Sequence, residues 1–225
     1  IGLQSDIVGT TYSWTVAVTG GVTGASNGSG SNIVQTLTAS GTTTGTVEYT
    51  ITATTPAPAG CTNSVVTKIP VTVYPIPTIS INTPAAICEG QSVSLTATVA
   101  PVGGTFLWTP GNLTTNPINV SPATTTSYNV QYTVNGCSNS ASRNVTVNPL
   151  PSVAINTSSS SICAGKTTTL TASSPDAGGT YSWAPGGAIT NAITVSPASN
   201  TTYTVTYTIG ATTCAKTATS AITVK

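Results

Sequence analysis

The sequence predicts an all-β protein built from three consecutive sandwich modules, at residues 1–74, 75–148 and 149–225. Three observations support this prediction. Apolar side chains alternate with polar ones along several segments, a set of motifs returns after about 75 residues, and glycine and proline interrupt the segments at short intervals. Because no stretch has a convincing helical periodicity, we expect strands and turns throughout.

The alternation is clear in a segment of each module. In the second module one face carries Tyr128, Val130, Tyr132 and Val134, and the other carries Asn129, Gln131 and Thr133. The same pattern runs through residues 203–209 and 47–52. Successive side chains of a strand point to opposite faces, so this pattern indicates strands with one buried face. Threonine, valine, isoleucine and tyrosine, which fit a pleated surface, dominate these segments.

The second and third modules are a tandem duplication. Both contain, in the same order, a Pro-x-Pro opening, Ile-Cys-x-Gly, Gly-Thr-x-x-Trp, Val-Ser-Pro-Ala before a tyrosine, and a late cysteine. Cys88 is equivalent to Cys163 (163 − 88 = 75), and Cys137 to Cys214 (214 − 137 = 77). An offset that drifts so little over the whole unit indicates a repeat.

The first module is a more distant relative. Thr11-Tyr12-Ser13-Trp14 matches residues 180–183 at an offset of 169 (183 − 14), which places the equivalent of Cys163 before Ile1. We therefore expect this module to lack its opening strand and first cysteine, and the chain to be a segment of a longer protein. The additional residues at Gly20–Asn32 and Thr55–Gly60 are predicted to be long loops.

The connectors Pro75-Ile76-Pro77 and Pro149-Leu150-Pro151 are short and rich in proline. Proline fixes its own φ and restrains the preceding residue, so we expect semi-rigid joints. Modules of roughly 35 Å that stack along their long axes would form an elongated rod.

Charge is almost absent from the sequence. Only 4% of the residues are charged, and the net charge is +1. Nucleic-acid binding requires clustered cations, whereas the five lysines and arginines here are scattered, so we expect no nucleic-acid partner. No apolar run approaches the roughly 20 residues of a membrane-spanning helix, so we expect no transmembrane segment.

The sequence offers no support for catalysis or for a cofactor. The chain has no histidine. Its acidic residues are Asp6, Glu48, Glu89 and Asp176. Their separation leaves no carboxylate pair for hydrolysis and no group of metal ligands. Gly24–Gly28 matches G-x-S-x-G without a histidine base, and Gly165-Lys166-Thr167 lacks the earlier glycine of a phosphate loop. We expect no enzyme, catalytic residue, cofactor or metal site.

The five cysteines are predicted to be mainly structural. The repeat suggests that Cys88 pairs with Cys137 and that Cys163 pairs with Cys214. Cys61 holds the late-cysteine position of the first module and is expected to be unpaired within this segment. Stable disulfides imply an oxidising compartment and therefore export. The alternative is that the thiols are free and buried.

Five aromatic residues are predicted to lie in the cores: Trp14, Trp108, Trp183, Tyr128 and Tyr203. The tryptophans recur where the core of each module recurs, which favours burial. The alternative is that they form sugar-stacking platforms together with the large residue two positions earlier. The two tyrosines follow a Ser-Pro-Ala turn, and they either form a tyrosine corner or pack as ordinary strand residues.

These motifs resemble the Ig-like and PKD-like repeats of giant cell-surface adhesins of Bacteroidota. Residues 12–16 and 45–52 give the first module its similarity to the PKD-like subtype, and the likeness covers essentially the whole chain. The resemblance implies Ig-like or PKD-like β-sandwiches, export by the type IX secretion system, and a place on the cell surface, outside the Gram-negative outer membrane.

The same resemblance implies a structural or adhesive segment of a secreted filament protein, as in the gliding-motility adhesins of flavobacteria. Its partners would be surface polysaccharide or abiotic surfaces, and other subunits of a surface machinery. Two alternatives stay open. The chain could be a spacer of an exported polysaccharide-degrading enzyme, or a module could bind carbohydrate through Gly20–Asn32 or an exposed aromatic side chain.

Overall fold

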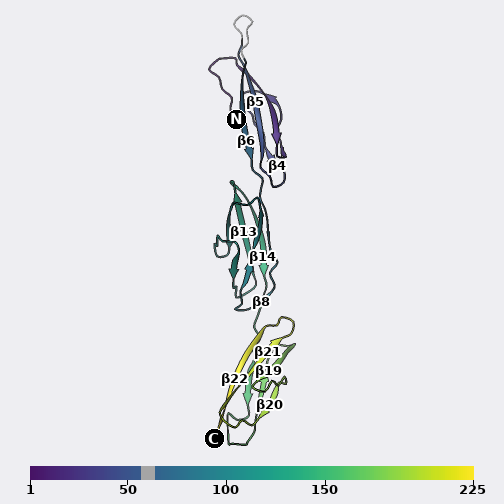
Figure 1. The fold of residues 1–225 in the computed structure, drawn as a ribbon, viewed down its shortest axis with the longest axis vertical. Helices are drawn as coiled ribbons and strands as arrows, with labels where there is room; N and C mark the ends of the chain where they lie inside the picture. Colours follow the sequence, from purple (N-terminus) through teal and green to yellow (C-terminus); the bar gives the residue numbers. More distant parts are fainter. Residues whose placement is uncertain (57–63) are drawn as a thin grey trace. The chain divides into compact units, whose positions relative to one another are not determined.

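The computed structural model describes residues 1–56 and 64–225 (Figure 1). In these two ranges the regular secondary structure consists of strands, β1 to β22, without a helix. The all-β, Ig-like or PKD-like sandwich fold predicted from the sequence is confirmed. A helix that could cross a bilayer is absent from the same two ranges.

The chain divides into two compact units. The first contains Ile1–Thr83, Leu95–Ile118 and Tyr128–Arg143; the second contains Pro84–Ser94, Asn119–Ser127 and Asn144–Lys225. The division passes through the module predicted at residues 75–148. The boundaries of the three modules and their arrangement as a rod therefore stay predictions.

The N-terminal part of the first unit contains β1 (Thr11–Thr19), β2 (Val22–Thr23), β3 (Gly28–Ser29), β4 (Thr38–Ala39), β5 (Gly45–Thr54) and β6 (Ser64–Val73). Four of these strands form an antiparallel sheet in the order β3-β1-β5-β6, and β2 pairs separately with β4. The stretch Gly20–Asn32 is therefore not the plain loop that its composition suggested, because β2 and β3 lie within it. Residues 57–63, in and after the second predicted loop, lie outside the described residues.

The core of this part forms as the alternation predicts. Val47, Tyr49 and Ile51 on β5 are buried, and they cluster with Trp14, Val22 and Ile33. Because Val22 and Ile33 come from outside the four-stranded sheet, they cover its apolar face. The opposite face of β5 carries threonine and Glu48, which water can solvate.

The remaining strands of the first unit, together with those that cross its boundary, are β7 (Thr78–Ile81), β9 (Val93–Leu95), β10 (Ala97–Ala100), β11 (Thr105–Thr109), β12 (Ile118–Val120), β13 (Thr126–Val134) and β14 (Cys137–Val145). Strand β7 pairs with β10, and β11 pairs with β13. Trp108, Val130 and Tyr132 are almost completely buried.

The second unit contains β8 (Ile87–Cys88), β15 (Val147–Asn148), β16 (Ala154–Thr157), β17 (Ser161–Ile162), β18 (Thr168–Ser173), β19 (Gly179–Ala184), β20 (Ala192–Val195), β21 (Thr201–Ile209) and β22 (Ala215–Val224). Two sheets, β16-β18-β20 and β17-β22-β21-β19, form a sandwich. Its core contains Leu170 from the first sheet and Trp183, Tyr203, Val205 and Ile222 from the second. These strands run side by side at the C-terminal end of the chain in Figure 1.

Candidate functional site: a disulfide and its pinned loops

The three tryptophans are buried, each with its indole N–H bonded to a loop. Their exposed fractions are 7% for Trp14, 0% for Trp108 and 1% for Trp183. The three Nε1 atoms donate to the carbonyl oxygens of Ser26 (3.1 Å), Thr115 (3.1 Å) and Thr190 (2.9 Å) respectively. A ring buried this deeply cannot stack on a sugar, so the tryptophans offer no platform for carbohydrate.

Tyr128 and Tyr203 are each 7% exposed, at the start of the buried faces of β13 and β21. The tyrosines whose hydroxyl groups bond distant backbone are Tyr132 and Tyr207, each four residues further along the same strand. The Tyr132 hydroxyl donates to the Pro101 carbonyl and accepts from the Gly104 amide, at 2.9 and 2.7 Å. Tyr132 therefore holds the loop before β11, a role that was not predicted from the sequence.

Tyr207 makes the equivalent contacts in the third repeat, where the first, second and third repeats are the predicted modules at residues 1–74, 75–148 and 149–225. Its hydroxyl donates to the Asp176 carbonyl and accepts from the Gly179 amide, the latter at 3.1 Å. Its ring also contacts the ring of Tyr181, with 4.8 Å between the centroids. The signal was present in the sequence, because Tyr132 and Tyr207 are equivalent positions of the alternating pattern.

The stretch Gly20–Asn32 is held by a polar network. Gln35 donates from Nε2 to the Ser26 carbonyl at 2.7 Å, and its Oε1 accepts from the Tyr49 hydroxyl at 2.8 Å. Asn27 Oδ1 accepts from the Val16 amide at 2.9 Å. Burial raises the pKa of Tyr49 above its ordinary value, which favours the protonated phenol that donates to Gln35.

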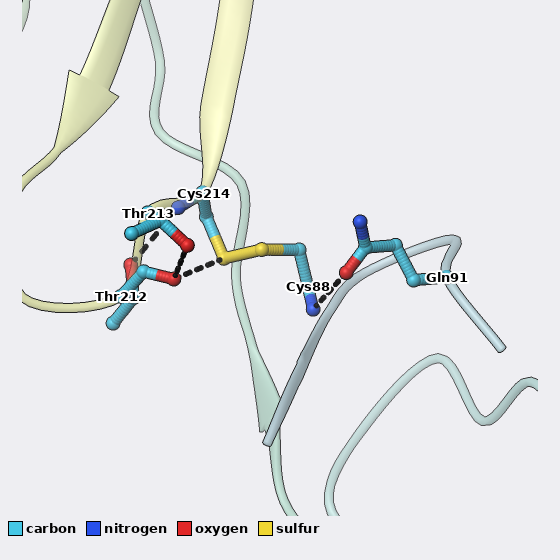
Figure 2. The surroundings of a disulfide bond; sticks show 5 residues. All are labelled: Cys88, Gln91, Thr212, Thr213 and Cys214. Atoms are coloured by element: carbon cyan, nitrogen blue, oxygen red, sulfur yellow. Dashed lines mark hydrogen bonds between the residues drawn. A yellow bond between two sulfur atoms is a disulfide. The ribbon is translucent and has the colours of Figure 1, made fainter. Parts of the chain in front are cut away.

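The disulfide lies in the second unit and joins Cys88 to Cys214, with 5.6 Å between the Cα atoms (Figure 2). Cys88 ends β8, and its amide donates to Gln91 Oε1 at 3.0 Å. Cys214 directly precedes β22, in a turn where its sulfur lies 3.7 Å from the Thr212 carbonyl oxygen. The bond closes a sequence separation of 126 residues and fits an extracellular protein.

Neither pair suggested by the repeat is formed. Cys137 and Cys163 have free thiols, and Cys88 and Cys214 are bonded to each other instead. For Cys163 and Cys214 the reason is the length of β22. Ile162, the residue before Cys163, pairs with Val224 at the end of this strand, whereas Cys214 precedes its start. Ten strand residues span roughly 33 Å, and a disulfide needs Cα atoms within about 7 Å. Cys61 lies outside the described residues.

A shallow groove with a volume of ≈ 510 Å³ lies beside the disulfide in the second unit. It is lined by Glu89, Gly90, Leu150, Pro151, Ser152, Val153, Lys216 and Thr217. The groove carries one charged side chain of each sign, Glu89 and Lys216.

Two of the four acidic side chains interact with different partners. Glu48 forms an ion pair with Lys68 at 2.7 Å, and Asp176 accepts a bond from the Ser152 amide at 2.7 Å. No group of three or more histidine, cysteine, aspartate or glutamate side chains that could hold a metal occurs in residues 1–56 and 64–225.

Comparisons with known proteins find one family model and several solved structures of low similarity. A family model described as a PKD-like domain matches residues 2–77. Among curated proteins no sequence matches the chain. The N-terminal eight Ig domains of Down Syndrome Cell Adhesion Molecule (DSCAM) are 16% identical, with a TM-score of 0.45, over 95% of this chain and 32% of that chain.

Two further solved structures are similar at the same low level. A three-Ig fragment of titin is 12% identical, with a TM-score of 0.44, over 97% of this chain and 89% of that chain. The insect immune protein hemolin is 11% identical, with a TM-score of 0.36, over 80% of this chain and 56% of that chain. None of these likenesses identifies a ligand or an activity.

Proposed function

We propose that the chain is a non-catalytic structural and adhesive repeat segment of a secreted bacterial cell-surface protein of the gliding-adhesin type. The observation that carries the proposal is the disulfide between Cys88 of the second repeat and Cys214 of the third. A covalent bond between consecutive repeats resists separation under load, which an adhesin needs and a soluble catalyst does not.

The surface chemistry supports the adhesive part of the proposal. Outward strand faces carry threonine in place of the usual lysine and glutamate. In the pairs Thr15↔Thr50 and Thr206↔Thr217 one threonine is exposed and the other is half-buried. Hydroxyl groups can exchange hydrogen bonds with the hydroxyl groups of a neutral polysaccharide or with hydrated glass. With a net charge of +1, such binding would depend little on salt.

The test measures binding of the purified chain to films of neutral polysaccharide, films of acidic polysaccharide, and glass. Each surface coats a quartz crystal, and the mass that it takes up reports the binding. We expect saturable uptake on the neutral film and on glass that changes little when the salt concentration is raised. A Ser31→Glu variant places a charge in the exposed part of Gly20–Asn32 and should weaken binding if this stretch makes contact. Ser199→Glu, at an exposed position of the third repeat, is the matched control.

Absence of saturable uptake on every film would contradict the adhesive part of the proposal. Binding only to acidic polysaccharide, lost at high salt, would indicate a different kind of surface from the neutral one that we propose.

A further inference from the structure

We infer that the cysteines of these repeats bond from each repeat to the next: the early cysteine of one repeat bonds to the late cysteine of the repeat that follows. Cys88 and Cys163 are the early cysteines, and Cys137 and Cys214 are the late ones. The inference concerns covalent structure, and it does not depend on what the surface binds.

The first support is the bond that exists. Cys88 is the early cysteine of the second repeat and Cys214 is the late cysteine of the third, and both belong to the second unit. Pairing within the third repeat would have to cover the length of β22, because Cys163 and Cys214 lie beside opposite ends of this strand. The fold therefore permits the bond between repeats and prevents the bond within one.

The second support is the equivalent setting of the two early cysteines. Cys88 ends β8, which pairs in parallel with β15, and the Glu89 amide donates to the Asn148 carbonyl at 3.0 Å. Residue 163 follows β17, which pairs in parallel with the end of β22, and the Ala164 amide donates to the Lys225 carbonyl at 3.1 Å. Each early cysteine thus lies beside the last residues of its own repeat, where the next repeat would begin.

The turn after each early cysteine is also the same. The Gln91 amide donates to the Cys88 carbonyl at 3.0 Å, and the Lys166 amide donates to the Cys163 carbonyl at 3.0 Å. The backbone therefore presents the exposed Cys163 thiol as it presents the bonded Cys88 sulfur. Any repeat joined after Lys225 in the way that Pro149 follows Asn148 would bring its late cysteine to Cys163.

The late cysteines show the complementary arrangement. In the first unit the Cys137 sulfur lies 3.8 Å from the carbonyl oxygen of Tyr74, the residue before Pro75. In the second unit Thr212, two residues before Cys214, lines a groove together with Asn148 and Pro149. Each late cysteine therefore lies beside the connector that enters its own repeat, where the preceding repeat's early cysteine would be.

Formation of each bond is an oxidation. Two thiols lose two protons and two electrons and become one disulfide, and a small disulfide such as oxidised glutathione accepts them and is reduced to two thiols. The rule therefore applies to a chain that folds in an oxidising compartment.

The existing chain provides the first test. In a Cys61→Ser background, free thiols are alkylated without reduction, and the digested peptides are mapped by mass spectrometry. We expect a peptide linked through Cys88 and Cys214, with Cys163 alkylated. Cys163→Ser should leave the linked peptide unchanged, whereas Cys214→Ser should make Cys88 available for alkylation. Linked peptides that join Cys88 to Cys137, or Cys163 to Cys214, would overturn the inference.

A chain extended by one repeat provides the second test. A copy of residues 149–225 is fused after Lys225 of the same full chain, which supplies one more early and one more late cysteine. We expect Cys163 to link to the late cysteine of the copy and to become protected from alkylation. In the control copy that late cysteine is replaced by serine, and Cys163 should stay reactive. Cys163 reactive in both chains, or a bond within the copy, would contradict the rule.

Discussion

Each buried tryptophan packs in a core with its ring and holds a loop with its indole N–H, which donates to a carbonyl oxygen of that loop. Trp183 is 1% exposed, and its Nε1 donates to Thr190 at 2.9 Å. Replacing Trp183 by phenylalanine keeps a ring but leaves a void and removes the donor. We expect strands β19 and β21 to lose about 2–4 kcal/mol of protection, measured by amide hydrogen exchange.

Ile189→Ala is the control for this variant, since Ile189 is adjacent to Thr190 but 77% exposed. It should change the exchange free energies by less than about 0.5 kcal/mol. Equal effects of the two substitutions would show that the indole hydrogen bond does not hold the loop.

Gly179 lies against the ring of Tyr207, whose hydroxyl group bonds the loop before β19. A Cβ at this position would be 2.3 Å from Tyr207 Cζ and 2.6 Å from the Tyr207 hydroxyl oxygen. Gly179→Ala should therefore displace the ring and cost about 1–3 kcal/mol, measured as a lower unfolding temperature. Gly210→Ala is the matched control, because its nearest neighbour, the Gly178 carbonyl oxygen, is 3.5 Å away. A Gly179→Ala chain as stable as the control would show that this contact can relax.

The buried phenol of Tyr49 makes stability depend on pH in the alkaline range. Burial raises its pKa above the ordinary value of 10.0, so the folded chain keeps a proton that the unfolded chain loses. The stabilisation is complete below the ordinary pKa and disappears as pH rises through the folded one. Urea unfolding between about pH 8 and 11 should show this loss, and Tyr49→Phe should reduce it. An unchanged pH profile in the variant would assign the dependence to other groups, such as Tyr128, whose pKa burial also raises.

At the scale of the element, alternation predicted the strands well because it is a local property. Tyr128, Val130, Tyr132 and Val134 are all buried on β13, as the sequence pattern required. The disulfide pairing was wrong because it depends on which strand ends meet, and equivalent positions in a repeat do not encode that. Strands β2 and β3 were missed because each has only two residues, too few to alternate, within a stretch rich in glycine and serine.

Strand β6 is the exposed edge of the sheet β3-β1-β5-β6, and its first residues include Val65 and Val66, each 59% exposed. Lys68 and Pro70 interrupt this edge with a charge and a missing N–H, which hinders pairing with another chain. We expect Lys68→Val to increase self-association severalfold in sedimentation velocity, with little loss of stability, since exposed ion pairs contribute about 0–1 kcal/mol. Lys68→Arg should stay monomeric. If Lys68→Val did so too, the lysine would not protect the edge.

For the whole molecule, the disulfide changes the covalent path between the two ends of the chain. A pulling force that arrives at Cys88 can pass directly to Cys214, so the residues between them carry no tension while the bond is intact. Pairing within repeats would leave the connector Pro149-Leu150-Pro151 on the path and would divide the protected residues into two separate loops of 49 (137 − 88) and 51 (214 − 163) residues.

Single-molecule pulling from the two ends distinguishes these paths. The bond hides 126 residues, or roughly 420–450 Å of extended chain, as one length. Under oxidising conditions we expect unfolding to release only the chain outside Cys88–Cys214, and addition of a reductant under load should release the hidden length in one step. Cys214→Ser should show the full extension without reductant, whereas Cys163→Ser should behave as the unmodified chain. Two shorter releases on reduction would instead show bonds within repeats, and the covalent connection between repeats would be absent.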